Sequence, residues 1–136
     1  MSSISTIALS GLNAAANRLQ VSASNVANSQ TTGTLPSADG SVPAGAPQAY
    51  SPLELVQTES PGGGVQTSVT TVTPSTTAVY DPQASFANQD GLVAAPNVDL
   101  AQEFVGQLLA SYSFAANAAV LKADDRNNKA LLDITV

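Results

Sequence analysis

Apolar and small residues form two rows at heptad spacing in the C-terminal part of the chain, over residues 97–130. One row runs through Ala101, Phe104, Leu108, Ser111, Ala115 and Ala118, and the other through Val105, Leu109, Tyr112, Ala116, Ala119 and Ala123. Alternating steps of three and four residues keep side chains on one face of an α-helix, and the two rows lie about 100° apart. Because a two-stranded coiled coil uses a single row, the pattern predicts a long helix that packs against several neighbours.

The residues around this stretch carry helix start and stop signals. Asp99 can cap the helix N-terminus, and Gln102 stands three residues later in the capping-box position. Arg126 and Lys129 lie near the expected C-terminal end, where cations favour the helix dipole. The apolar residues after Lys129 are expected to be buried against another part of the structure, because an exposed apolar end favours aggregation.

A second long helix is predicted over residues 3–28. Its heptad row consists of Ala8, Leu12, Ala15, Leu19, Ser22 and Val26. Asn25 and Asn28 lie four residues apart on one face near its end. Two interpretations of these asparagines stay open: local capping of the helix, or a specific polar contact with a neighbouring chain.

The middle of the chain predicts a loop followed by short strands. Residues 34–49 are rich in proline and glycine and predict a mobile or extended loop. Residues 53–59 and 65–72 are rich in β-formers and flank Pro61 and three glycines, which predicts a hairpin in which Thr67 is exposed. Residues 77–80 predict a further short strand, and residues 84–96 an irregular segment with a turn at Asp90 and Gly91.

The fold class is therefore predicted to be α+β. Two long terminal helices pair antiparallel as a coiled-coil-like hairpin, and a small β-rich insert lies between them. The expected divisions are an N-terminal helix over residues 1–33, the flexible loop over 34–49, the β-rich insert over 50–96 and a C-terminal helix over 97–136.

Composition indicates that this fold depends on partners. The chain has 136 residues, of which only 4% are aromatic, so it offers little bulky core for its length. Ordering each residue costs about 1–2 kcal/mol of conformational entropy, so we expect neighbouring chains to supply much of the missing burial. The net charge of −6, with only four basic residues, argues against binding to nucleic acid or to an anionic membrane surface.

The residue inventory argues against catalysis. The sequence contains no cysteine and no histidine, which excludes disulfides, thiol and imidazole catalysis and most transition-metal sites. Asp124 and Asp125 are adjacent, so in a helix they point about 100° apart and do not share a site. We interpret them as a solvated or inter-subunit patch in preference to an acid–base pair. No catalytic, cofactor-binding or metal-binding residue is predicted.

The sequence predicts neither a cleaved signal nor a membrane span. The first residues lack the basic segment of a secretory signal peptide. No window is expected to reach the roughly 18 apolar residues that a membrane-spanning helix needs.

The two ends of the chain resemble the bacterial flagellar basal-body rod protein family. In the N-terminal part the resemblance rests on SGL at residues 10–12, RL at 18–19, NVAN at 25–28 and TTG at 31–33. The aromatic residue that usually follows this last glycine is absent, since Thr34 and Leu35 stand there. In the C-terminal part, VYDP at 79–82, PNVDL at 96–100 and SYSFAAN at 111–117 resemble the proximal rod class of that family.

This resemblance implies a structural subunit of the proximal rod, exported through the flagellar type III apparatus without a cleaved signal peptide and located in the periplasmic part of the basal body. It implies helical polymerisation through the terminal helices into a torque-transmitting drive shaft. The implied partners are the subunit itself, other rod proteins and the membrane-ring and export-gate components at the base, with no nucleic acid and no direct membrane insertion. The alternatives are another flagellar axial (rod or hook) component, a secreted helical-hairpin interaction protein and, least favoured by the residue inventory, an enzyme.

The heptad rows and the resemblance together predict one assembly interface on the two helices. Its residues are Leu12, Leu19, Asn25, Val26, Asn28, Phe104, Leu108, Ser111, Tyr112, Ala115, Asn117 and Ala118.

Overall fold

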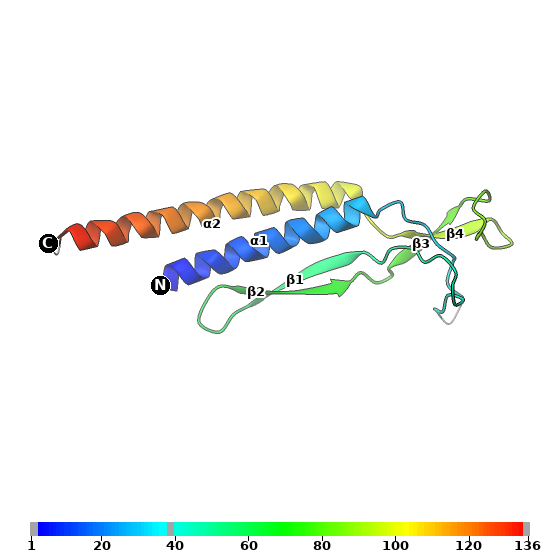
Figure 1. Cartoon of the computed structure of the whole chain (residues 1–136), viewed down its shortest axis with the longest axis horizontal. Coiled ribbons are helices and arrows are strands. Elements are labelled where there is room, and N and C mark those ends of the chain that lie inside the picture. Colours follow the sequence, from blue (N-terminus) through cyan, green and yellow to red (C-terminus); the bar gives the residue numbers. More distant parts are fainter. Residues whose placement is uncertain (1–2, 38–39, 135–136) are drawn as a thin grey trace.

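Two long helices lie side by side and run in opposite directions along most of the molecule (Figure 1). The computed structural model describes residues 3–37 and 40–134. Helix α1 spans Ser3–Ala27 and helix α2 spans Leu100–Ile134. The predicted start of α2 is confirmed, because Oδ1 of Asp99 accepts hydrogen bonds from the backbone N–H groups of Ala101 (2.9 Å) and Gln102 (3.2 Å). α2 continues past the stop signals around Lys129 to Ile134, within the predicted division 97–136.

The contact between the two helices is made by small and polar residues. On α1 the buried positions facing α2 are Ala8, Ala15 and Ser22, three members of the predicted row, and on α2 the buried alanine is Ala110. A Cβ atom on Gly11 would overlap the side chain of Asn117, so this amide packs directly on the backbone of α1. Along α2 the contact follows a third heptad row, through Glu103, Gln107, Ala110, Asn117 and Asp124, which the sequence analysis did not single out.

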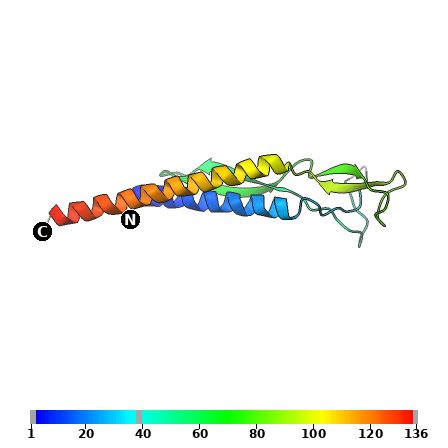
Figure 2. The ribbon, with the colours of Figure 1, turned by 90° about the horizontal axis from the view of Figure 1, so that it is seen from above.

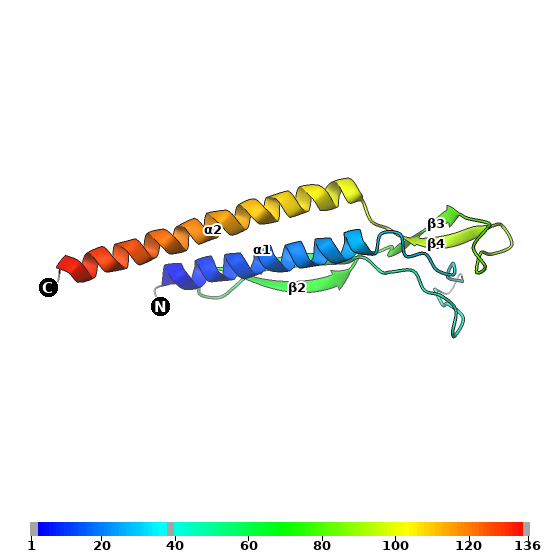
Figure 3. The ribbon, with the colours of Figure 1, turned by 45° about the horizontal axis from the view of Figure 1, so that its top comes forward.

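A β-hairpin packs on the side of α1 that faces away from α2. Strands β1 (Leu53–Glu59) and β2 (Val65–Thr71) pair antiparallel, with Leu53 opposite Thr71 and Glu59 opposite Val65. The hairpin predicted from the sequence is confirmed. α1 therefore lies between α2 and the hairpin, and all three run along the same axis (Figure 3).

Polar side chains one heptad apart on α1 bind the hairpin. Oγ of Ser10 accepts a hydrogen bond from the backbone N–H of Val65 (3.1 Å), and Nδ2 of Asn17 donates one to Oγ1 of Thr67 (2.9 Å). The expectation that Thr67 is exposed is wrong, because alternation along β2 turns this side chain toward α1.

A second, separate two-stranded sheet lies beyond the ends of the helices, away from both termini (Figure 2). Strand β3 (Thr76–Tyr80) pairs antiparallel with β4 (Leu92–Pro96), and Gly33 forms a bridge to Ala94 on the other side of β4. The prediction that residues 84–96 are wholly irregular is wrong over β4. Alanine and proline have low β-propensity, and burial specifies this strand: Val93 is 0% and Ala94 1% exposed.

The segment from residue 34 to 49 is a loop in its described parts, 34–37 and 40–49. The loop is fastened where it leaves the helical region, because the backbone N–H of Thr34 donates to the carbonyl of Pro47 (2.8 Å). The backbone N–H of Tyr50 likewise donates to the carbonyl of Thr31 (3.3 Å).

Glycine substitutions at the hairpin tip test how the hairpin is docked. Gly62 and Gly64 both have positive φ (98° and 89°), so alanine is strained at either position. A Cβ on Gly64 would also overlap Oγ of Ser10, whereas a Cβ on Gly62 meets nothing within 4 Å. Gly64→Ala is expected to speed hydrogen exchange of the Val65 amide in the purified subunit, and Gly62→Ala to affect it less. Equal effects of the two substitutions would show that the tip does not rest on α1.

Candidate assembly surface

Helix α2 leaves almost all of its apolar side chains exposed. Of its 35 residues, all of which the structure describes, Ala110 and Asp124 are the two that are buried. Phe104, Leu108 and Tyr112 are 58%, 55% and 66% exposed. Exposed apolar patches of this extent on one element indicate an interaction surface.

One apolar surface spans both helices and is called here the groove surface. A groove of about 300 Å³ lies between α1 and α2 and is lined by Ala15, Ala16, Leu19, Ala110, Ser111 and Phe114. Steps of three, four and seven residues from Ser111 place Phe104, Leu108, Ala115 and Ala118 on the same side of α2. Steps from Ala16 and Leu19 place Leu12 and Val26 on the same side of α1.

A second apolar row of α2, called here the outer row, lies on a different side of the helix from the groove surface. It consists of Val105, Leu109, Tyr112, Ala116 and Val120, all of them exposed. The two predicted heptad rows of α2 thus lie on either side of the contact with α1. The helix pair uses neither row, so both are free to meet other chains.

The predicted interface residues fall into three groups. Most lie on the groove surface, and Tyr112 lies in the outer row. The three asparagines are engaged within the chain. Asn25 is 2% exposed and binds both β1 and α2. Asn28 donates a hydrogen bond to the carbonyl of Ser24 (2.9 Å). Asn117 packs against Gly11 and donates a hydrogen bond to the carbonyl of Ser113 (2.8 Å). The sequence alone did not indicate whether these asparagines make contacts within the chain or between chains.

The C-terminal end of α2 extends past the start of α1 (Figure 2). The hydroxyl of Ser5 donates to the carboxylate of Asp124, which marks the level at which α1 begins. Almost three turns of α2, on the order of 15 Å, continue beyond Asp124 to Ile134. Leu131 and Leu132 are exposed there, so the expected burial of the apolar tail is not found within this chain; residues 135–136 lie outside the described part.

Asp124 and Asp125 have different surroundings. Asp124 is buried (7% exposed), so its interpretation as part of a solvated patch is wrong. Asp125 is exposed and pairs with Lys129 (2.7 Å). The two carboxylates share no site, as their helical spacing predicts.

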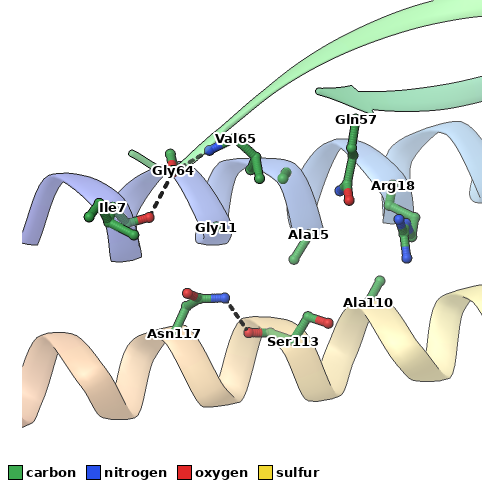
Figure 4. Close-up of a pocket in the computed structure, with 12 residues that line it drawn as sticks. Ile7, Gly11, Ala15, Arg18, Gln57, Gly64, Val65, Ala110, Ser113 and Asn117 are labelled. Atoms are coloured by element: carbon green, nitrogen blue, oxygen red, sulfur yellow. Dashed lines mark hydrogen bonds between the residues drawn. The ribbon is translucent and has the colours of Figure 1, made fainter. Parts of the chain in front are cut away.

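A groove of about 270 Å³ with a mixed polar and apolar lining lies on the other side of the helix pair, where α1 lies between α2 and the hairpin (Figure 4). Arg18, Gln57 and Asn117 contribute its larger polar side chains. The residues that line it, all of them in the described part of the chain, include no carboxylate or imidazole that could act as a general base.

By length and composition alone, α2 is long and apolar enough to cross a membrane. The expectation that no window reaches this threshold is therefore wrong. The reason is that alanine, valine and leucine outnumber charged residues over an 18-residue window. In the structure α2 is held along one side by α1, through hydrogen bonds such as that from Gln107 Nε2 to Ser22 Oγ (3.1 Å).

Two family models match the two ends of the chain. A model described as flagella basal body rod protein matches residues 6–33, which form α1 and the segment up to the bridge at Gly33. A model described as flagellar basal body rod FlgEFG protein C-terminal matches residues 89–134, which form β4 and α2. The matched segments are those that carry the groove surface and the outer row.

Curated relatives match most of the chain. The flagellar basal-body rod protein FlgC of Salmonella typhimurium is 37% identical over 115 residues, covering 85% of this chain and 83% of the relative. The proteins of the same name from Escherichia coli O157:H7 and Yersinia enterocolitica are each 36% identical with the same coverage. With two terminal helices that fit the family models and relatives that span nearly its whole length, the chain belongs to the FlgC family of flagellar basal-body rod proteins.

Proposed function

We propose that this chain, a structural subunit of the proximal flagellar rod, polymerises helically through the groove surface and the outer row of its terminal helices. One observation carries the proposal: α2 exposes both of its apolar rows while it contacts α1 through a third row of small and polar residues. A subunit that functioned alone would have to keep these side chains in water. Covering one Leu-sized side chain contributes about 1.5–3 kcal/mol, so each added neighbour stabilises the polymer substantially.

The proposed arrangement follows from the order of the layers. The paired helices, acting as a coiled-coil-like hairpin, form the inner wall of the rod, because they carry the apolar rows. The β-rich region between residues 50 and 96 lies outside, where its exposed polar strand residues face water. Residues 1–33 and 97–136 are thus the assembling parts of the subunit, and they transmit torque along the drive shaft.

The chemistry of the surface favours protein partners. The partners proposed are further copies of the subunit, other rod proteins and the membrane-ring and export-gate components at the base. The net charge of −6 disfavours nucleic acid. α2 is proposed to lie in this protein wall without entering a bilayer, since leaving for lipid would break its polar contacts with α1. The subunit acts by assembly and not by catalysis, as its named relatives are rod proteins.

Replacing Leu108 by aspartate tests the assembly surface. Leu108 is 55% exposed on the groove surface, so the change is expected to leave the fold of the subunit intact. In the polymer it would bury an unpaired charge, which costs several kcal/mol in every subunit. Cells that carry Leu108→Asp should make and export the subunit but build no rod, and therefore lack hooks and fail to swim. Leu12→Asp should act in the same direction.

The matched control is Ser68→Asp, on the exposed side of β2. The neighbouring Thr67 is unsuitable as a control, because it accepts a hydrogen bond from Asn17 of α1. Cells with Ser68→Asp should swim nearly as well as the wild type. If Leu108→Asp cells swim as well as this control, the exposed rows of α2 are not assembly surfaces.

The proposed location in the periplasmic part of the basal body depends on the route of export. We expect delivery through the flagellar type III apparatus without cleavage of a signal peptide. In cells that lack this apparatus, fractionation should find the subunit only in the cytoplasm, with its N-terminal residues retained. Normal delivery to the periplasm in such cells would refute this route.

A further inference from the structure

The side chain of Asn25 lies where α1 ends, β1 begins and α2 starts. Its Oδ1 accepts hydrogen bonds from the backbone N–H of Leu53 (2.9 Å) and the hydroxyl of Tyr50 (3.0 Å). Its Nδ2 donates to the carbonyl of Leu53 (2.8 Å) and to Oε1 of Glu103 (2.6 Å). A side-chain amide has two donors and two acceptor sites, so Asn25 uses all of its hydrogen-bonding capacity.

The amide of Asn25 replaces a neighbouring strand along the free edge of β1. β1 has one partner strand, β2, so its other edge has unpaired backbone groups. Asn25 exchanges one donor and one acceptor with the backbone of Leu53, which is the pattern that an antiparallel strand would supply. At 2% exposure this contact is shielded from water, and a missing partner there is therefore costly.

Asn25 also connects two elements whose backbones do not meet. In the described part of the chain, the backbones of α2 and the hairpin each lie against that of α1 and not against each other. A side chain of α1 that binds both elements can therefore couple them. The amide of Asn25 provides such a path, because Leu53 begins β1 and Glu103 lies in the first turn of α2.

We propose that Asn25 is the positioning residue that fixes the hairpin relative to the helix pair, so that the hairpin docks only when the start of α2 is packed on α1. The role rests on the proposed function in one respect: the helices form the wall of the rod, and Asn25 sets the direction in which the hairpin leaves that wall. An amide is required, because Glu103 and the carbonyl of Leu53 need donors while the N–H of Leu53 needs an acceptor.

An exchange of amide and carboxylate tests this role. Asn25→Asp retains the acceptor but places a carboxylate against Glu103 and leaves the carbonyl of Leu53 unpaired. Swimming should be lost. Glu103→Gln should have little effect, since Oε1 of glutamine still accepts from Asn25. The double variant Asn25→Asp with Glu103→Gln restores a donor–acceptor pair between the two positions, and it should recover at least half of the wild-type swimming radius.

Asn13→Asp is the matched control, because it makes the same chemical change at an exposed position of α1. It should swim nearly normally. If the double variant swims no better than Asn25→Asp alone, the contact with Glu103 does not carry the role of Asn25 and the proposal fails.

A second measurement is independent of rod assembly. In the purified full-length subunit, the amide of Leu53 should exchange hydrogen at least tenfold faster in Asn25→Asp than in the wild type, and the double variant should regain part of the protection. If the double variant recovers swimming but its Leu53 amide is not protected again from hydrogen exchange, the contact between positions 25 and 103 is made between two copies of the subunit. That result would overturn the proposal. Because this readout does not need a rod, it decides on Asn25 even if Leu108→Asp shows that the proposed assembly surface is wrong.

Discussion

The close contact between α1 and α2 is the constraint on which the rest of the structure depends. It is made by alanine, glycine, serine and asparagine, so the two backbones approach each other but bury little apolar area. Small residues at the contact have a second effect: the large apolar side chains of both helices are left to point elsewhere. A subunit built in this way is held together mainly by the close packing of small side chains and by hydrogen bonds. The free energy of burying its large apolar side chains is not gained within the subunit and is left for the proposed contacts with neighbouring subunits.

α1 serves as the centre of the subunit because each of its faces has a different partner. One face holds the alanines that meet α2, and a second carries Ser10 and Asn17, which bind the hairpin through hydrogen bonds. The third face carries Leu12 and Leu19 and takes part in the groove surface. This division explains why the heptad row read from the sequence was only partly buried: it crosses from the face that meets α2 to the face that meets solvent.

Sequence reasoning could predict the elements whose signals are local. Periodicity gave both long helices, Asp99 gave the start of α2, and β-branched residues around the glycines gave the hairpin. It missed β4 because Ala94 and Ala95 have low strand propensity and are specified by burial. It located the exposed apolar rows but not the third row, since Glu103, Gln107 and Asn117 look like solvated positions until α1 is placed against them.

The composition of α2 would suit either a bilayer or a protein wall, and its polar row favours the protein wall proposed above. A helix in lipid has to satisfy every polar group within the membrane, yet Glu103, Gln107 and Asn117 follow the same side of α2 as Ala110. In the subunit this side is covered by α1, and its polar groups are bound by Ser22 and Asn25 or by the backbone of α2 itself. Covering the remaining apolar sides with further subunits, as proposed above, would leave these hydrogen bonds in place, whereas inserting α2 in lipid would break those to Ser22 and Asn25. The row that holds the two helices together thus also favours protein over lipid as the neighbour of α2.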